Sequence, residues 1–170
     1  PGDVSKDLKS FIDKEGIQPE YMILTHGHGD HTGGIGDLRK TYPGIKLIAS
    51  KKEKKFLFDR KSSYGEGGIE CDIYVDDQEE MTVGNQKLKF ISTPGHTPGG
   101  MCILMDKVLF SGDTLFRSSI GRTDFPGGNF EDIVCSIKSK LFVLPEDTKV
   151  LPGHEEQTTI GYEARFNPFV

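Results

Sequence analysis

The spacing of apolar residues predicts helices and strands that alternate through the first half of the chain. One helical face runs through residues 4–15 and ends at Gly16, a residue typical of helix C-termini. The elements expected next are a strand at 22–25, a helix at 35–42, a strand at 45–49 and a helix at 51–58. Residues 59–70 are rich in glycine, serine and charge, so we expect an irregular loop there.

Short strands dominate the middle of the chain. Two-residue reversals with hairpin chemistry separate the expected strands 81–83 from 87–91 and 101–105 from 108–110. Residues 130–144 carry apolar side chains on one helical face, and a strand follows at 148–151. The pattern predicts one layered α/β domain with mixed sheets, spanning residues 1–170.

The charge balance disfavours two classes of partner. The chain has 21 basic and 26 acidic residues and a net charge of −5, so we expect no surface for nucleic acid or an anionic membrane. The lysines of residues 51–55 are interrupted by Glu53, as on a solvated helix face. No apolar run approaches the length of a membrane span, and the first residues lack a signal-peptide pattern. A small-molecule substrate remains the expected partner.

The three cysteines, Cys71, Cys102 and Cys135, are odd in number and far apart. They lack the paired spacing of disulfides or thiolate metal sites. This favours a reducing compartment, and we predict a cytoplasmic location.

Residues 26–31 carry the strongest chemical signal, since His26, His28, Asp30 and His31 are metal-ligand types within six positions. A single histidine beside a glycine is usually a turn or surface residue, and Asp30 alone could be a helix N-cap. Four residues that can bind metal in so short a span are hard to explain except by metal binding.

Three further residues of metal-binding type, His96, Asp113 and His154, each directly follow a glycine, shortly after a short apolar run. The cluster at 26–31 also follows an apolar run. We therefore expect four strands whose loops converge on one edge of a sheet core.

The spacing of these seven residues indicates two ions. His26 and His28 fall on one side of an extended segment, whereas the adjacent Asp30 and His31 must point differently. The expected ligands are His26, His28 and His96 for the first ion, Asp30, His31 and His154 for the second, with Asp113 giving one oxygen to each. No cysteine takes part, which favours a catalytic centre with a metal-bound hydroxide over a structural site. Zinc is the expected metal, and iron or manganese would accept the same ligands.

Residues 25–34, together with the three downstream ligand types, resemble the signature of the metallo-β-lactamase superfamily. Residues 110–116 and 121–125 resemble its glyoxalase II (hydroxyacylglutathione hydrolase) branch. The resemblance implies an αββα sandwich and the same two ligand sets, with Asp30 also orienting the hydroxide. Members of the family begin with a strand pair before the turn at Pro1-Gly2, so we expect the first strands of the fold to be missing here. Glyoxalase II proper also has a helical C-terminal domain, whereas the present sequence ends soon after His154.

The resemblance leads us to expect a binuclear hydrolase of a thioester such as S-lactoylglutathione. Arg122 is expected to bind the anionic thiol carrier; the alternative is a structural ion pair with Asp124. Two other functions stay open. One is a persulfide dioxygenase with a single non-haem iron on His26, His96 and Asp113, and the other is a non-catalytic metal-binding domain.

Overall fold

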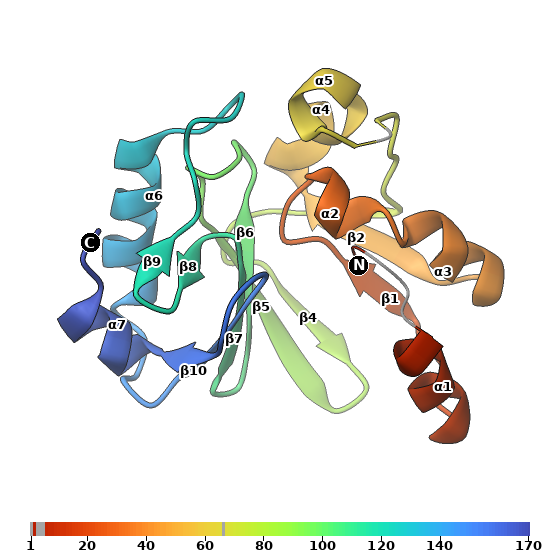
Figure 1. Ribbon diagram of the computed structural model, residues 1–170. Helices are drawn as coiled ribbons and strands as arrows, with labels where there is room; N and C mark the ends of the chain where they lie inside the picture. Colours follow the sequence, from red (N-terminus) through yellow and green to blue (C-terminus); the bar gives the residue numbers. More distant parts are fainter. Residues whose placement is uncertain (1, 3–5, 66) are drawn as a thin grey trace.

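The computed structural model describes residues 2, 6–65 and 67–170. The described strands form two main sheets, and helices lie on the outer side of each (Figure 1). The first sheet is parallel, with the order β1-β2-β3. Its strands are β1 (Tyr21–Ile23), β2 (Lys46–Ser50) and β3 (Ile73–Val75).

The second sheet is mixed, with the order β11-β10-β7-β6-β5-β4. Its strands are β4 (Glu80–Val83), β5 (Gln86–Ser92), β6 (Met101–Met105), β7 (Val108–Gly112), β10 (Lys149–Pro152) and β11 (Thr158–Thr159). A small hairpin of β8 (Leu115–Phe116) and β9 (Ser119–Ile120) follows β7. The β4–β5 and β6–β7 pairs are the hairpins that the sequence predicts.

The helices divide between the two outer faces. Beside the first sheet lie α1 (Lys6–Lys14), α2 (Gly29–Thr32), α3 (Ile35–Thr41), η1 (Lys51–Glu53), α4 (Lys54–Phe58) and α5 (Arg60–Ser63). Beside the second lie α6 (Phe130–Ser136), the π-helical turn η2 (Ile137–Leu141) and α7 (Ile160–Phe166). No helix in the described part of the chain is long and apolar enough to cross a membrane.

Three separate apolar layers hold these elements together. Alternation along a strand sends neighbouring side chains to opposite faces, so Ile48 of β2 packs between the sheets while Leu47 packs against α3 and α4. In β5, Phe90 likewise joins the layer between the sheets and Ile91 packs toward α6. Helix, sheet, sheet and helix therefore stack in that order, which confirms the predicted αββα sandwich.

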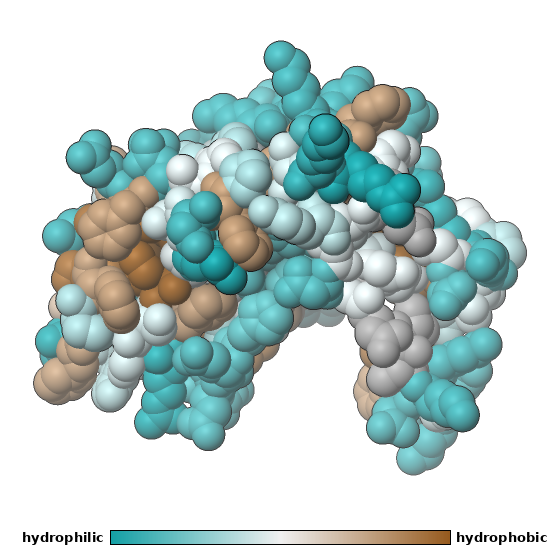
Figure 2. Space-filling model, turned by 45° about the horizontal axis from the view of Figure 1, so that its top comes forward, coloured by the Kyte–Doolittle hydropathy of each residue, from teal (hydrophilic) through white to brown (hydrophobic). Residues whose placement is uncertain are grey.

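The outer helices do not bury all of their apolar surface. Apolar side chains gather on the side of α6 and α7, which lies at the left of Figure 2. Phe130 and Phe166 are 52% and 64% exposed there. In α1 only Ile12 is buried, whereas Phe11 on the predicted apolar face is exposed. Val4, predicted to share that face, lies outside the described residues.

The second sheet brings three strand ends to one edge. Strands β5 and β7 both run antiparallel to β6, and β10 runs parallel to β7. The carboxyl ends of β5, β7 and β10 therefore meet at the same edge, whereas β1 reaches that place from the other sheet. This corrects the expectation of a single sheet edge, because the loops converge from two sheets.

The sequence does not predict several short elements, among them α2, α5, β3, β8, β9 and β11. Helix α5 interrupts the expected loop at 59–70, and strands β3, β8 and β9 are two or three residues long. Such runs are too short for their periodicity to be recognised. The expected helix at 130–144 is α-helical only to Ser136. It then widens into a π turn, in which the Phe142 amide donates to Ile137 O over 3.0 Å.

Candidate metal centre

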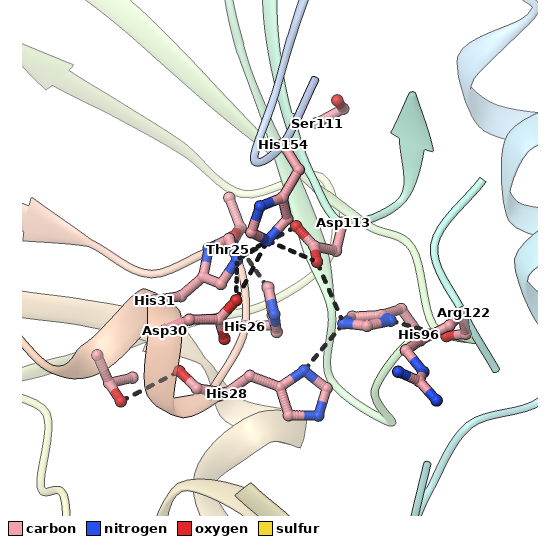
Figure 3. Close-up of polar contacts among 12 residues, drawn as sticks. Thr25, His26, His28, Asp30, His31, His96, Ser111, Asp113, Arg122 and His154 are labelled. Atoms are coloured by element: carbon pink, nitrogen blue, oxygen red, sulfur yellow. Dashed lines mark hydrogen bonds and ion pairs between the residues drawn. The ribbon is translucent and has the colours of Figure 1, made fainter. Parts of the chain in front are cut away.

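The seven predicted ligand residues meet at the edge where the two sheets converge (Figure 3). His26 and His28 lie in the loop that follows β1, and Asp30 and His31 lie in α2. The other three, His96, Asp113 and His154, follow β5, β7 and β10. Asp30 is inside the first turn of α2, whose N-cap is His28, so the reading of Asp30 as an N-cap is wrong.

His26, His28 and His96 form a buried group, each with at most 5% of its surface exposed. His28 Nδ1 lies 2.9 Å from His96 Nε2. The ring centroids of His26 lie 4.9 Å from those of His28 and 4.7 Å from those of His96. This arrangement matches the set expected for the first ion.

Asp30, His31 and His154 form a second group nearer the surface. His154 Nε2 lies 3.1 Å from Asp30 Oδ2 and 3.3 Å from His31 Nε2. The side chains of Asp30 and His154 are more than half exposed. An ion held here would have one side open to solvent and substrate, as catalytic sites require.

Asp113 lies between the two groups (Figure 3). Its Oδ1 is 3.2 Å from His31 Nε2, and its Oδ2 is 3.6 Å from His96 Nε2 and 3.5 Å from His154 Nε2. One carboxylate therefore reaches ligand nitrogens of both groups, as the bridging role requires.

The donor atoms fit a divalent ion. Four ligands at about 2.0–2.1 Å in tetrahedral geometry lie about 3.3 Å apart, close to the spacing seen here between nitrogens and oxygens of neighbouring ligands. His26 Nε2 is buried and has no hydrogen-bond partner among the described residues. A buried nitrogen without a partner is costly unless an ion fills the gap.

The protonation states also suit metal binding. Burial lowers the pKa of His26 well below its ordinary value and lowers that of His28 to about 4. Burial lowers the pKa of His96 too. Burial alone would raise the pKa of Asp113, but the hydrogen bond with His31 and the charges of His31, His96 and His154 together outweigh it and lower that pKa. Neutral imidazoles and an ionised carboxylate are the forms that bind metal.

Neighbouring backbone fixes the position of the ligands. His96 Nδ1 lies 2.8 Å from Arg122 O, so Nδ1 donates and Nε2 is left free to face an ion. Gly112 has φ of 51°, and a Cβ there would lie 2.5 Å from Thr25 Cβ. A Cβ on Gly153 would lie 2.3 Å from Asp113 Oδ1. These two glycines permit the close approach of the loops that carry Asp113 and His154.

The pocket beside the two groups has a volume of about 550 Å³, and the candidate ligands that line it are His28, Asp30, His96, Asp113 and His154. Its remaining wall is mostly aromatic or polar and comprises Gly29, Tyr64, Phe116, Ser119, Ile120, Arg122, Phe125 and Glu155. The Tyr64 and Phe125 rings are 4.7 Å apart, and the Phe125 ring is 5.7 Å from His28. The pocket thus offers an apolar contact surface directly beside the buried ligand group.

Arg122 lines this pocket and also forms the ion pair that the sequence offered as an alternative. Its Nε and Nη2 each donate to Asp124 over 2.7 Å, and its guanidinium lies 3.7 Å from the Phe125 ring centroid. The guanidinium is about half exposed. Arg122 therefore lines the pocket and pairs with Asp124 at the same time, and Asp124 orients its guanidinium at the rim of the pocket.

The sequence does not mark the aromatic residues of the pocket, nor Glu53, whose segment resembles a solvated helix face. Glu53 is 1% exposed and accepts hydrogen bonds from two loops of the site. Tyr64 belongs to the segment expected to be an irregular loop. No local pattern marks these residues, because their role depends on contacts with distant segments.

Comparisons with known proteins identify the family of this chain. The profile of the Metallo-beta-lactamase superfamily matches residues 2–154. "Hydroxyacylglutathione hydrolase GloC" of Haemophilus influenzae is 35% identical over 180 residues, which cover 100% of this chain and 84% of the relative.

Two solved structures are also similar. "BLEG-1 B3 metallo-beta-lactamase" superposes with a TM-score of 0.91 at 35% identity, covering 99% of this chain and 85% of that one. "TTHA1623 in a di-iron-bound form" gives a TM-score of 0.86 at 30% identity, covering 100% and 87%. By sequence and by fold, this chain belongs to the metallo-β-lactamase superfamily.

Proposed function

We propose that this chain is a binuclear metal hydrolase that cleaves a thioester such as S-lactoylglutathione. The observation that carries the proposal is the convergence of all seven candidate ligand residues, five of which line one pocket. The similarity to the Haemophilus influenzae hydroxyacylglutathione hydrolase supports the substrate class.

The ligand residues have distinct tasks in this proposal. His26, His28 and His96 would hold the deeper ion and Asp30, His31 and His154 the outer one, with Asp113 between them. When bound, such a pair of ions supplies a hydroxide nucleophile near neutral pH and polarises the substrate carbonyl. Zinc suits these ligands, and iron does so equally, as the di-iron form of TTHA1623 illustrates.

Asp30 has the exposure needed to meet a reactant. Its side chain is 58% exposed while its Oδ2 lies 3.1 Å from His154 Nε2. The carboxylate can accept a hydrogen bond from the attacking water and so orient it toward the carbonyl. A thiolate leaves readily, so the reaction needs no strong general acid.

The rim of the pocket fits an anionic thiol carrier. Arg122 is held in place by Asp124 and keeps its guanidinium about half exposed. An oriented guanidinium binds a carboxylate at lower entropic cost than a free one. Tyr64 and Phe125 offer an apolar surface beside it for the rest of the substrate.

A β-lactam hydrolase is the second candidate, favoured by the similarity to BLEG-1. The same ligand set could serve that reaction, because both need a nucleophile directed at a carbonyl. The two substrates differ in the leaving group, a thiolate in one case and a ring nitrogen in the other.

The test begins with protein purified without added metal, whose zinc, iron and manganese contents are measured. Turnover is then followed on S-lactoylglutathione, on a chromogenic cephalosporin, and on glutathione persulfide with an oxygen electrode. The matched control is the His154→Ala variant, which loses one outer ligand and should lose hydrolysis.

Two ions per chain with thioester hydrolysis is the expected result. Cephalosporin hydrolysis without thioester hydrolysis would favour the second candidate. Oxygen uptake with one iron would instead favour a persulfide dioxygenase. Two bound ions without turnover of any of these compounds would favour a non-catalytic metal-binding domain.

A further inference from the structure

Glu53 is a buried carboxylate behind the candidate metal centre. It is the last residue of η1 and only 1% exposed. Its Oε1 accepts a hydrogen bond from the Gly27 amide over 2.8 Å, and its Oε2 accepts one from the Gly99 amide over 2.7 Å. Each carboxylate oxygen is therefore engaged by a different loop.

Both loops carry ligands of the deeper ion. Gly27 stands between His26 and His28, and Gly99 comes three residues after His96. The first loop follows β1 of the three-stranded sheet, whereas the second connects β5 to β6 of the six-stranded sheet. One side chain thus links the two sheets at the point where the deeper ligand group is assembled.

The two glycines allow this link to be short. A Cβ on Gly99 would lie 2.2 Å from the Glu53 backbone nitrogen, and a Cβ on Gly27 would lie 2.8 Å from Leu57 Cδ2 of α4. Any larger residue at position 99 would push the His96 loop away from η1. The close approach of the Gly99 backbone to η1 and the hydrogen bonds of the Glu53 carboxylate therefore hold the His96 loop at the same point.

The ligand group needs such support. His28 Nδ1 and His96 Nε2 lie 2.9 Å apart, and His26 Nε2 has no hydrogen-bond partner among the described residues. Three buried imidazoles gain little from one another without an ion. Contacts on the side of the loops that faces away from the ion must then hold the three histidines at the separation that an ion requires.

We propose that Glu53 is a positioning residue, which fixes the His26–His28 loop against the His96 loop and so preorganises the deeper metal site. This inference rests on the metal centre proposed above. Hydrogen bonds from backbone amides to a buried carboxylate are charge-assisted and hence stronger than neutral ones. The hydrogen bonds of the Glu53 carboxylate go to Gly27 and Gly99 and not to Asp30, His31 or His154, so the outer site should depend on it much less.

The test uses Glu53→Gln, which keeps the size of the side chain. An amide can present only one oxygen, so its NH₂ group must face one of the two amide donors. The matched control is Glu163→Gln on α7. Glu163 is equally buried and accepts three hydrogen bonds, but from Ser118, Thr158 and Asn167, none of which is a candidate ligand.

Metal-free protein is titrated with Co²⁺ against a competing chelator, and the visible absorption of bound Co²⁺ is recorded. Removing a group that orients metal ligands typically weakens binding by about 10–100-fold. We expect Glu53→Gln to weaken one of two binding steps by that factor and to change its spectrum. In a His154→Ala background, where only the deeper group is complete, Glu53→Gln should weaken the remaining step.

The Glu163→Gln control should lower the unfolding midpoint without changing either binding step. Equal Co²⁺ affinities and spectra in wild type and Glu53→Gln would overturn the positioning role of Glu53 but leave the proposed metal centre standing. A wild-type protein that takes up no Co²⁺ would overturn the metal centre itself.

Hydrogen exchange of the metal-free wild type gives a second test that needs no variant. The amides of Gly27 and Gly99 should exchange slowly and together, because Glu53 holds both without metal. Rapid exchange at both positions would overturn the inference even if Glu53→Gln failed to fold.

Discussion

Replacing Asp113 by alanine should release more metal than replacing any single histidine of the site. Asp113 is the residue that approaches both ligand groups, with His31 on one oxygen and His96 and His154 on the other. Each histidine belongs mainly to one group. The Asp113→Ala variant therefore removes one ligand from each ion and also the negative charge between two dications.

The size of the effect can be worked out from the ligand count. A four-ligand zinc site contributes about 10–16 kcal/mol in apparent binding free energy, so one ligand accounts for about 2.5–4 kcal/mol. That loss corresponds to about 100-fold to 1,000-fold weaker binding. In Asp113→Ala it applies to both ions, whereas in His28→Ala or His154→Ala it applies to one.

Each variant is dialysed against a zinc buffer at which the wild type stays saturated, and bound zinc is measured by elemental analysis. We expect about one ion in the histidine variants and less than one in Asp113→Ala. Asp113→Asn, which keeps the size and one acceptor oxygen, should lie between Asp113→Ala and wild type. An Asp113→Ala protein that retains as much zinc as His154→Ala would refute the bridging role.

Three further outcomes are expected. Arg122→Ala should raise KM for S-lactoylglutathione about tenfold or more with kcat little changed, because the variant loses an exposed charge-assisted contact that is made equally in the ground and transition states. An unchanged KM, or damage to both constants with a lower unfolding midpoint, would indicate that Arg122 only pairs with Asp124 in a structural role. The chelated protein should lose stability as pH falls from about 6.5 toward 4, because His28 binds a proton in the unfolded state but stays neutral in the folded state, where its pKa is about 4. Complete protonation of the unfolded residue lowers the free energy of unfolding by about 3 kcal/mol. Denaturant titrations at pH 7.5 and 5 should therefore show a smaller loss of stability in His28→Gln than in the wild type. Alkylation of the exposed Cys135 should leave turnover unchanged, and a loss of activity at full metal content would contradict a mechanism without thiols.

The sequence alone determined the identity of the candidate ligands and much of the local structure. Ligand-type residues after apolar runs were visible because strand ends and glycine turns are local features. The hairpins β4–β5 and β6–β7 and helix α3 followed for the same reason, since each depends on the spacing of residues a few positions apart.

How these elements meet depends on contacts between distant parts of the chain. His28 and His96 are 68 positions apart, and His31 and His154 are 123 apart. Their distances depend on the packing of two sheets through Ile48 and Phe90, which no local pattern records. The short strands β3, β8 and β9 exist because they pair with or follow longer ones. The burial of Glu53 within a lysine-rich segment has the same origin, since its two hydrogen-bond donors come from loops 26 and 46 positions away.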